Sequence, residues 1–298
     1  RGDMDQIKIE FSRFSAFYSP LILTMAGGFL EREGLNYSYT VSTPGRTAMD
    51  AVLDGSVHVV QSAISASFPF VAKGQQPDVV HFAQINESDG FFLLGREPDP
   101  NFSWSNLAGK DVLVDHGGQP MAMFKYGCLK AGLDYGKINP IDAGSPEDME
   151  AAFRSGMGDY IHAQGPVPQQ LQQEGIGHVI ASVGEAIGLV AFSTLAAKAE
   201  WLETDMAAAF MRAYRAARQL VVATPSGEIA ELESCFFPGI ESDALAETIA
   251  TYQKLGCWTP HLDITREAFE VAVDVFLHSG AISERMSYDL AVYPLPGE

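Results

Sequence analysis

The chain has 298 residues, of which 47% are hydrophobic and 19% are charged. This composition is typical of a well-packed α/β protein and excludes disordered, collagenous and coiled-coil classes, while the length predicts two domains. The formal net charge is −19, from 38 acidic and 19 basic side chains. Because such an excess would repel a phosphate backbone, we expect no nucleic-acid partner and a solvated acidic surface.

Short strands alternate with helices over the first 72 residues. Apolar runs predict strands over residues 7–11, 35–41 and 57–61, and helices over residues 20–33, 46–53 and 62–72. Ser19 followed by Pro20 predicts a helix N-cap with proline at the first helical position. This alternation is typical of a mostly parallel sheet with helices on both faces.

The same alternation returns in the middle of the chain and then stops. It predicts strands over residues 111–114, 138–142, 159–163 and 179–181, and helices over residues 121–131, 147–154 and 167–174. After residue 195 the pattern turns helical, over residues 201–222, 228–236, 242–255 and 265–279. Because each amphipathic helix must bury its apolar stripe, we expect this tail to pack on the first lobe.

The order of these segments predicts two lobes with a cleft between them. Residues 1–88 and 190–298 are expected to form a discontinuous first lobe, and residues 89–189 the second. The two chain crossings between the lobes contain Gly90 and Gly188. Glycine suits hinge segments that absorb backbone rotation.

Several kinds of site are not expected. The three cysteines, Cys128, Cys235 and Cys257, are odd in number and lie in different segments, which argues against a disulfide scaffold. No histidine stands at metal-ligand spacing from another histidine or a cysteine, so we expect no metal. There is no Gly-rich phosphate loop and no G-x-S-x-G motif, so we expect no nucleotide cofactor and no catalytic triad. No stretch offers the roughly 20 clean apolar residues of a membrane span.

Several short phrases, in the right order over nearly the whole chain, resemble the sulfonate, nitrate, taurine and thiamine-pyrimidine binding proteins of ABC importers. Residues 27–35 (GGFLEREGL) resemble that family's G-[YF]-F-x-x-E-G-L, and residues 48–59 (AMDAVLDGSVHV) resemble x-x-A-L-x-x-G-x-x-D, with His58 at the usual Asp. The other similar phrases are residues 107–112 (LAGKDV), 128–134 (CLKAGLD), 256–259 (GCWT) and 279–282 (SGAI).

The resemblance implies a two-lobed type-two periplasmic binding fold, in which each lobe is a mostly parallel sheet flanked by helices. It implies a monomer that encloses a small-molecule ligand by hinge closure and passes it to an ABC transporter permease. The location implied is the periplasm, or an exported and lipid-anchored state. The chain opens at Arg1 without an initiator Met or a signal peptide, which suits a processed or an artificially trimmed start and allows export.

Five loops, each between the carboxyl end of a strand and the start of a helix, are candidate ligand contacts, because ligands of open α/β sheets bind there. The hydroxyls among them also suit helix caps, and the aromatic side chains also suit the core. Arg46 suits an anion clamp or a surface position equally. In the first lobe the candidates are Ser12, Phe14, Phe17, Tyr18, Thr43, Arg46, Ser62, Ser65 and Phe68.

The second lobe supplies the remaining candidates. His116, Gly118 and Gln119 follow a predicted strand, and paired glycines let the backbone approach a ligand closely. His162 and Gln164 stand where the family carries a W-x-x-x-x-P segment. Their difference from the usual aromatic and acidic residues implies a different ligand type.

The candidate loops contain aromatic side chains and a few polar groups. This combination predicts a binding protein and not an enzyme. The alternatives are a pyrimidine-synthesis-like enzyme on the same fold, whose Cys-rich cluster is missing here, and a sensory domain. A sulfonate or carboxylate ligand would require Arg46 and helix N-termini. A flat heteroaromatic ligand would stack on Phe14, Tyr18 or Phe68. The scarcity of cations in the five loops favours a neutral or weakly anionic aromatic ligand.

Overall fold

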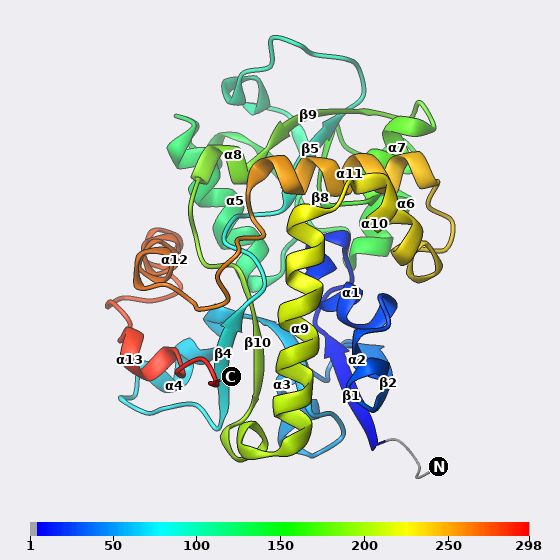
Figure 1. Ribbon diagram of the computed structural model, residues 1–298. Coiled ribbons are helices and arrows are strands. Elements are labelled where there is room, and N and C mark those ends of the chain that lie inside the picture. The colour runs from blue at the N-terminus through cyan, green and yellow to red at the C-terminus, as the bar shows by residue number, and fades with distance from the viewer. Residues whose placement is uncertain (1–4, 298) are drawn as a thin grey trace.

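The computed structural model describes residues 5–297 and contains two five-stranded sheets, each flanked by helices (Figure 1). The strand orders are β2-β1-β3-β10-β4 and β7-β6-β8-β5-β9. In each sheet four strands run in one direction, and the fifth, β10 or β5, runs against its neighbours. The predicted α/β fold with mostly parallel sheets is confirmed. None of the helices in residues 5–297 is long and apolar enough to cross a membrane.

The first sheet is organised around β1, in which the alternate residues Ile7, Ile9 and Phe11 are fully buried, as the period of a strand requires. Its strands are β1 (Asp5–Phe11), β2 (Leu35–Val41), β3 (Val59–Ala63), β4 (Val79–Gln84) and β10 (Ser193–Lys198). The second sheet contains β5 (Phe91–Gly95), β6 (Asp111–Leu113), β7 (Asn139–Ile141), β8 (Tyr160–Gln164) and β9 (His178–Ser182).

The sequence pattern does not predict β4, β5 or β10. Nearly every residue of these strands is buried, so they lack the apolar and polar alternation of a half-exposed strand. Strand β10, with sequence STLAAK, is also poor in the β-branched and aromatic residues that favour strands.

Helices cover both sheets and form most of the chain after β10. The α-helices are α1 (Ser19–Ala26), α2 (Phe29–Arg32), α3 (Ala48–Leu53), α4 (Phe68–Val71), α5 (Gly118–Lys130), α6 (Pro146–Arg154), α7 (Val167–Gln173), α8 (Val183–Ile187), α9 (Asp205–Ala223), α10 (Ser226–Glu233), α11 (Ser242–Leu255), α12 (Arg266–Ser279) and α13 (Tyr288–Ala291). Short 3-10 helices are Ala16–Tyr18, Ile64–Ser67, Trp104–Leu107, Tyr135–Lys137, Ala199–Glu203 and Ser234–Phe236.

The prediction of a first helix over residues 20–33, capped by Ser19, is wrong in two respects. The helix is divided into α1 and α2 because Gly28 has φ 76°, a left-handed conformation that interrupts a helix. Ser19 is not an N-cap but the first residue of α1, because a 3-10 turn precedes it. The cap of that turn is Ser15, whose hydroxyl accepts a hydrogen bond from the Phe17 amide at 3.0 Å.

The helical tail packs on the first sheet's helices and also reaches the second. Helix α9 packs against α1 and α2, as predicted for the first lobe (Figure 1). Helix α11 contacts α7 and helix α12 contacts α5. The predicted helix over residues 201–222 is divided at Thr204, whose side chain accepts from the Ala207 amide and caps α9. The tail therefore links the two units.

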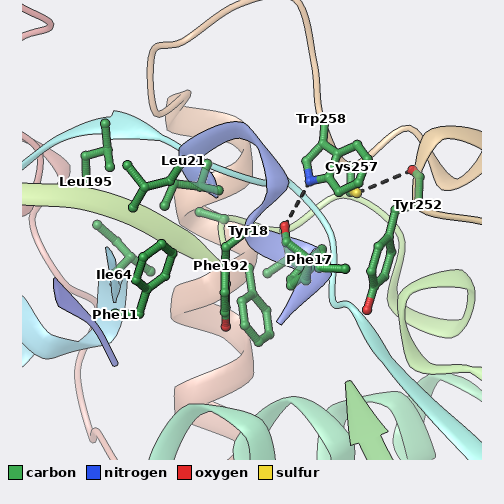
Figure 2. Close-up of a cluster of buried hydrophobic side chains, with 14 of the residues drawn as sticks. Phe11, Phe17, Tyr18, Leu21, Ile64, Phe192, Leu195, Tyr252, Cys257 and Trp258 are labelled. Atoms are coloured by element: carbon green, nitrogen blue, oxygen red, sulfur yellow. Dashed lines mark hydrogen bonds between the residues drawn. The ribbon is translucent and has the colours of Figure 1, made fainter. Parts of the chain in front are cut away.

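A cluster of buried aromatic side chains joins the two sheets (Figure 2). The Phe17 ring lies 5.0 Å from the Tyr252 ring and 5.3 Å from the Phe192 ring. Phe92 of β5 lies 5.5 Å from Tyr252. The Trp258 indole donates a hydrogen bond to the Phe17 carbonyl at 2.9 Å. Phe17 thus sits in a fully packed site at the junction.

Gly90 is expected to tolerate no side chain, because a Cβ atom there would lie 2.5 Å from the Phe17 ring. Gly90→Ala should lower the free energy of unfolding by about 1–3 kcal/mol, the usual cost of overpacking. Urea denaturation measures the change. Gly227→Ala in α10 is the matched control, since a Cβ there meets nothing within 4 Å and alanine favours a helix. An equal loss in both variants would contradict the packing argument.

Candidate ligand-binding cleft

A cavity of about 810 Å³ lies between the two sheets, where the carboxyl ends of β1 and β2 face those of β6, β7 and β8. Such an edge is where open α/β sheets bind ligands. Its lining consists of residues 12–14, 41–48, 91, 115–117, 142, 144–147, 149–150 and 162–167.

The loop after β1 is held by a buried amide from the neighbouring strand. Gln61 of β3 accepts hydrogen bonds through Oε1 from the Ser12 amide and hydroxyl, both at 3.0 Å, and from the Arg13 amide at 3.2 Å. Its Nε2 donates to the Ser193 hydroxyl of β10 at 3.0 Å. Ser12 and Arg13 are therefore fixed at the cavity wall by the sheet itself.

An ion pair crosses from the first sheet's loops to the second's. Arg13 Nη2 lies 2.8 Å from Asp115 Oδ1, and the same oxygen accepts from the Gly117 amide at 2.8 Å. A Cβ at position 117 would lie 2.5 Å from Arg13 Nη2, so any larger residue there would displace the guanidinium from this position. Sequence reasoning missed both charged residues, although each is in a predicted loop. The sequence signal that could have found them is that one of the two loops contains a single positive side chain and the other a single negative one.

His162 lies at the cavity wall as a neutral, fully buried imidazole. Its ring lies 4.3 Å from the Phe91 ring and 4.6 Å from the Phe124 ring. Burial lowers the pKa of His162 to about 3, and the charges of His116 and Arg13 act in the same direction. The Asp115 amide donates to Nδ1 at 3.2 Å, which places the ring proton on Nε2. Within the described residues, Nε2 is buried and has no partner.

Gln164 ties the second sheet to the first. Its Nε2 donates to the Tyr18 hydroxyl at 2.9 Å, and burial raises the pKa of Tyr18 to about 12. The adjacent Gly165 carbonyl accepts from the Ser15 hydroxyl at 2.5 Å and the Ala16 amide at 3.2 Å. The predicted strand over residues 159–163 includes His162 but not Gln164. Gln164 also belongs to β8, because pairing with β5 continues to Phe91 opposite Gln164.

The structure separates the predicted site residues into three groups. Those lining the first cavity are Ser12, Phe14, Thr43, Arg46, His116, His162 and Gln164. Those lining a second cavity of about 920 Å³ are Ser65, Phe68, Gly118 and Gln119. Those that are buried and line neither of these two are Phe17, Tyr18 and Ser62. Residues 115–117 line the first cavity and residues 118–119, at the start of α5, line the second. Ligand contact by any of these residues stays a prediction.

Arg46 is used within its own loop. Its Nη2 lies 2.7 Å from Asp54 Oδ2 and donates to the Ser56 hydroxyl at 2.9 Å, and its Nη1 is 3.9 Å from Glu10 Oε1. The start of α3 is closed by a capping box between Thr47 and Asp50. The surface alternative for Arg46 therefore fits better than an anion clamp at this helix.

Comparison with protein families identifies the chain. The model of the family described as NMT1/THI5 like matches residues 17–228. The chain belongs to the NMT1/THI5-like family. Among its relatives is protein YtlA of Bacillus subtilis, which carries the provisional name of a binding protein. It is 28% identical over 293 residues, which cover 97% of this chain and 88% of the relative.

Solved structures show which fold this NMT1/THI5-like chain has. The alkanesulfonate-binding protein SsuA of Xanthomonas axonopodis is 17% identical with a TM-score of 0.74, covering 99% of this chain and all of its own. A ligand-binding component of a Staphylococcus aureus ABC-type import system is 16% identical with a TM-score of 0.76, covering 97% of each chain. The desulfurization enzyme DSZB is 13% identical with a TM-score of 0.68, covering 97% of this chain and 96% of its own. The periplasmic binding protein fold is therefore confirmed.

The cysteines of this NMT1/THI5-like chain lie away from both cavities. Cys128 and Cys257 are buried, whereas Cys235 is exposed, and none of the three lines either cavity. Burial raises the pKa of the Cys128 thiol to about 12 and also raises that of Cys257. In residues 5–297, no group of three or more His, Cys, Asp or Glu side chains is arranged to hold a metal ion.

Proposed function

We propose that the chain is an extracytoplasmic solute-binding protein, periplasmic or lipid-anchored. It acts as a monomer, encloses a small organic molecule between two lobes, and delivers it to the permease of an ABC importer. The observation that carries the proposal is the cavity between the strand ends of the two sheets. The names of relatives in binding and import systems support it.

The proposed lobes are residues 1–88 with 190–298, and residues 89–189, and hinge closure brings them together. Two chain segments connect the sheets and run side by side. The Val190 amide donates to the Glu87 carbonyl at 3.1 Å, and the Ile85 amide donates to the Ser193 carbonyl at 2.9 Å. Gly188 has φ 80°, which only glycine adopts easily. Paired connections with a permissive glycine support bending at this place.

The proposed ligand is a flat, neutral, aromatic or heteroaromatic molecule with a hydrogen-bond acceptor. Phe14 and Phe91 supply aromatic surface at the cavity, and His162 supplies a neutral donor. Aromatic walls with a few placed polar groups are typical of small-molecule sites. We propose binding without catalysis: no cysteine lines the cavity, and the Ser12 hydroxyl donates to Gln61 and not to a base.

Two measurements test solute binding. Native mass spectrometry of the purified, never-denatured chain is expected to show a co-purified small molecule. Adding that molecule at 100 times its Kd should stabilise the native state by about 2.7 kcal/mol, seen as a rise in Tm of several degrees. Phe14→Ala should reduce the ligand-dependent rise, and Leu232→Ala, at an exposed site outside the cavity, should not. Conversion of the molecule into a product by the chain would contradict the proposal.

A further inference from the structure

We propose that Asp115 determines the charge class of the ligand. Its carboxylate forms an ion pair with the Arg13 guanidinium, and this pairing excludes anions from the cleft. The inference rests on the proposed function and names the ligand class of that same cavity. Its ligands are neutral or cationic, and sulfonates and carboxylates are rejected.

The charges at the cavity are unequal and already paired. Only two guanidinium groups line the cavity in the described chain, those of Arg13 and Arg46, and each faces a carboxylate of the protein at 2.7 or 2.8 Å. The carboxylates that line the cavity are Asp115, Asp142, Glu147 and Glu150. An arriving anion therefore meets more negative than positive groups, and like charges at short range repel.

Asp115 is fixed where it lies, so an anion cannot simply displace it. Its side chain is 7% exposed, against 28% for Arg13. The carboxylate accepts from the Gly117 amide, and the residue's own amide donates to His162. A ligand anion that reached Arg13 would stand beside a carboxylate that is already held by Arg13 and by the Gly117 amide. Arg13 would be shared between two negative groups.

The remaining polar groups of the wall supply no spare positive charge. His162 is neutral, because burial lowers its pKa to about 3. The Nδ1 of His116 lies 2.7 Å from the Val114 carbonyl and 3.9 Å from Asp142 Oδ1, so this imidazole also faces a carboxylate. Removal of the Asp115 charge therefore leaves the Arg13 guanidinium without a carboxylate partner at the cavity wall.

The test uses matched probes with one phenyl ring: benzenesulfonate, benzyl alcohol and benzylammonium. In isothermal titration at constant ionic strength, Asp115→Asn is expected to bind benzenesulfonate at least tenfold more tightly than the natural chain. Asp142→Asn makes the same change at another cavity carboxylate, which does not pair with Arg13, and should gain less than threefold. Arg13→Gln in the Asp115→Asn background should remove the gain.

Each outcome decides the question. No gain in Asp115→Asn, or an equal gain in Asp142→Asn, overturns the role of Asp115. In the natural chain, a larger rise in Tm with benzenesulfonate than with benzylammonium overturns anion exclusion, and this measurement needs no variant to fold. Such a rise would leave solute binding intact. Failure of the proposed function itself would appear as the absence of a co-purified molecule, which these titrations do not use.

Discussion

Arg218→Met is expected to lower the free energy of unfolding by about 3 kcal/mol or more, because it would leave several buried acceptors without a donor. Arg218 is 1% exposed on α9. Its guanidinium donates to the Thr259 carbonyl at 2.8 Å and the Ile85 carbonyl at 2.8 Å, and also contacts Gln84 and the Tyr214 hydroxyl. Methionine keeps the packing of the stem but donates nothing.

The control for this prediction is on the same helix. Arg212→Met removes an exposed guanidinium that lies 2.9 Å from Glu33, and exposed ion pairs contribute about 0–1 kcal/mol. Urea denaturation of both variants measures the difference. Because Arg218 anchors the end of β4 just before the connection between the sheets, equal losses in the two variants would show that its buried hydrogen bonds do not stabilise that junction.

The sequence predicts those parts of the fold whose pattern is local. Strand β1 alternates apolar and polar residues, so Ile7, Ile9 and Phe11 reveal it. Strand β5 is buried throughout and β10 is rich in alanine, so neither shows a period of two. Their antiparallel placement depends on contacts between segments more than 60 residues apart along the chain. Residue patterns within a short window cannot contain that information.

The candidate site shows the same limit. The rule that ligands bind at strand ends correctly predicts that loops such as the one with Ser12 and the one with His116 come together. The rule does not say which loop residues pair. Arg13 and Asp115 are 102 positions apart, and only the placement of one sheet against the other makes them partners. Phe17 and Tyr18 were candidates for the cleft, but they are buried at the junction of the sheets instead.

The stability of the chain is expected to fall as the pH rises from 6.5 to 8, and Asp89 is one cause. Its carboxyl is fully buried beside the connection between the sheets, and Oδ1 accepts from the Phe91 amide at 2.7 Å. In the described chain Oδ2 has no partner. Burial raises the pKa of Asp89 to about 8. The folded chain therefore holds a proton that the unfolded chain releases near pH 4.

The sign follows from proton binding. Because the folded state binds the Asp89 proton more tightly, the contribution to stability is complete below about pH 4 and is lost as the pH rises toward 8, by about 1.4 kcal/mol per pH unit. Burial lowers the pKa of His81 to about 4 and that of His162 to about 3. Their contribution rises with pH until the unfolded histidines lose their protons near 6.5. Above that value this opposing contribution levels off, and the loss from the buried carboxyls is the larger effect.

Asp89→Asn should therefore flatten the pH dependence between 6.5 and 8. The contribution of Asp89 falls by about 2 kcal/mol over this range, so the variant is expected to lose about 2 kcal/mol less stability than the natural chain. Burial also raises the pKa of Glu233, and this carboxyl keeps part of the slope in both proteins. Urea denaturation at several pH values measures both slopes. Asp78→Asn, the same change at an exposed carboxyl, should keep the natural slope. An unchanged slope in Asp89→Asn would mean that Asp89 is already ionised at pH 6.5, which its buried and half-unpartnered carboxyl argues against.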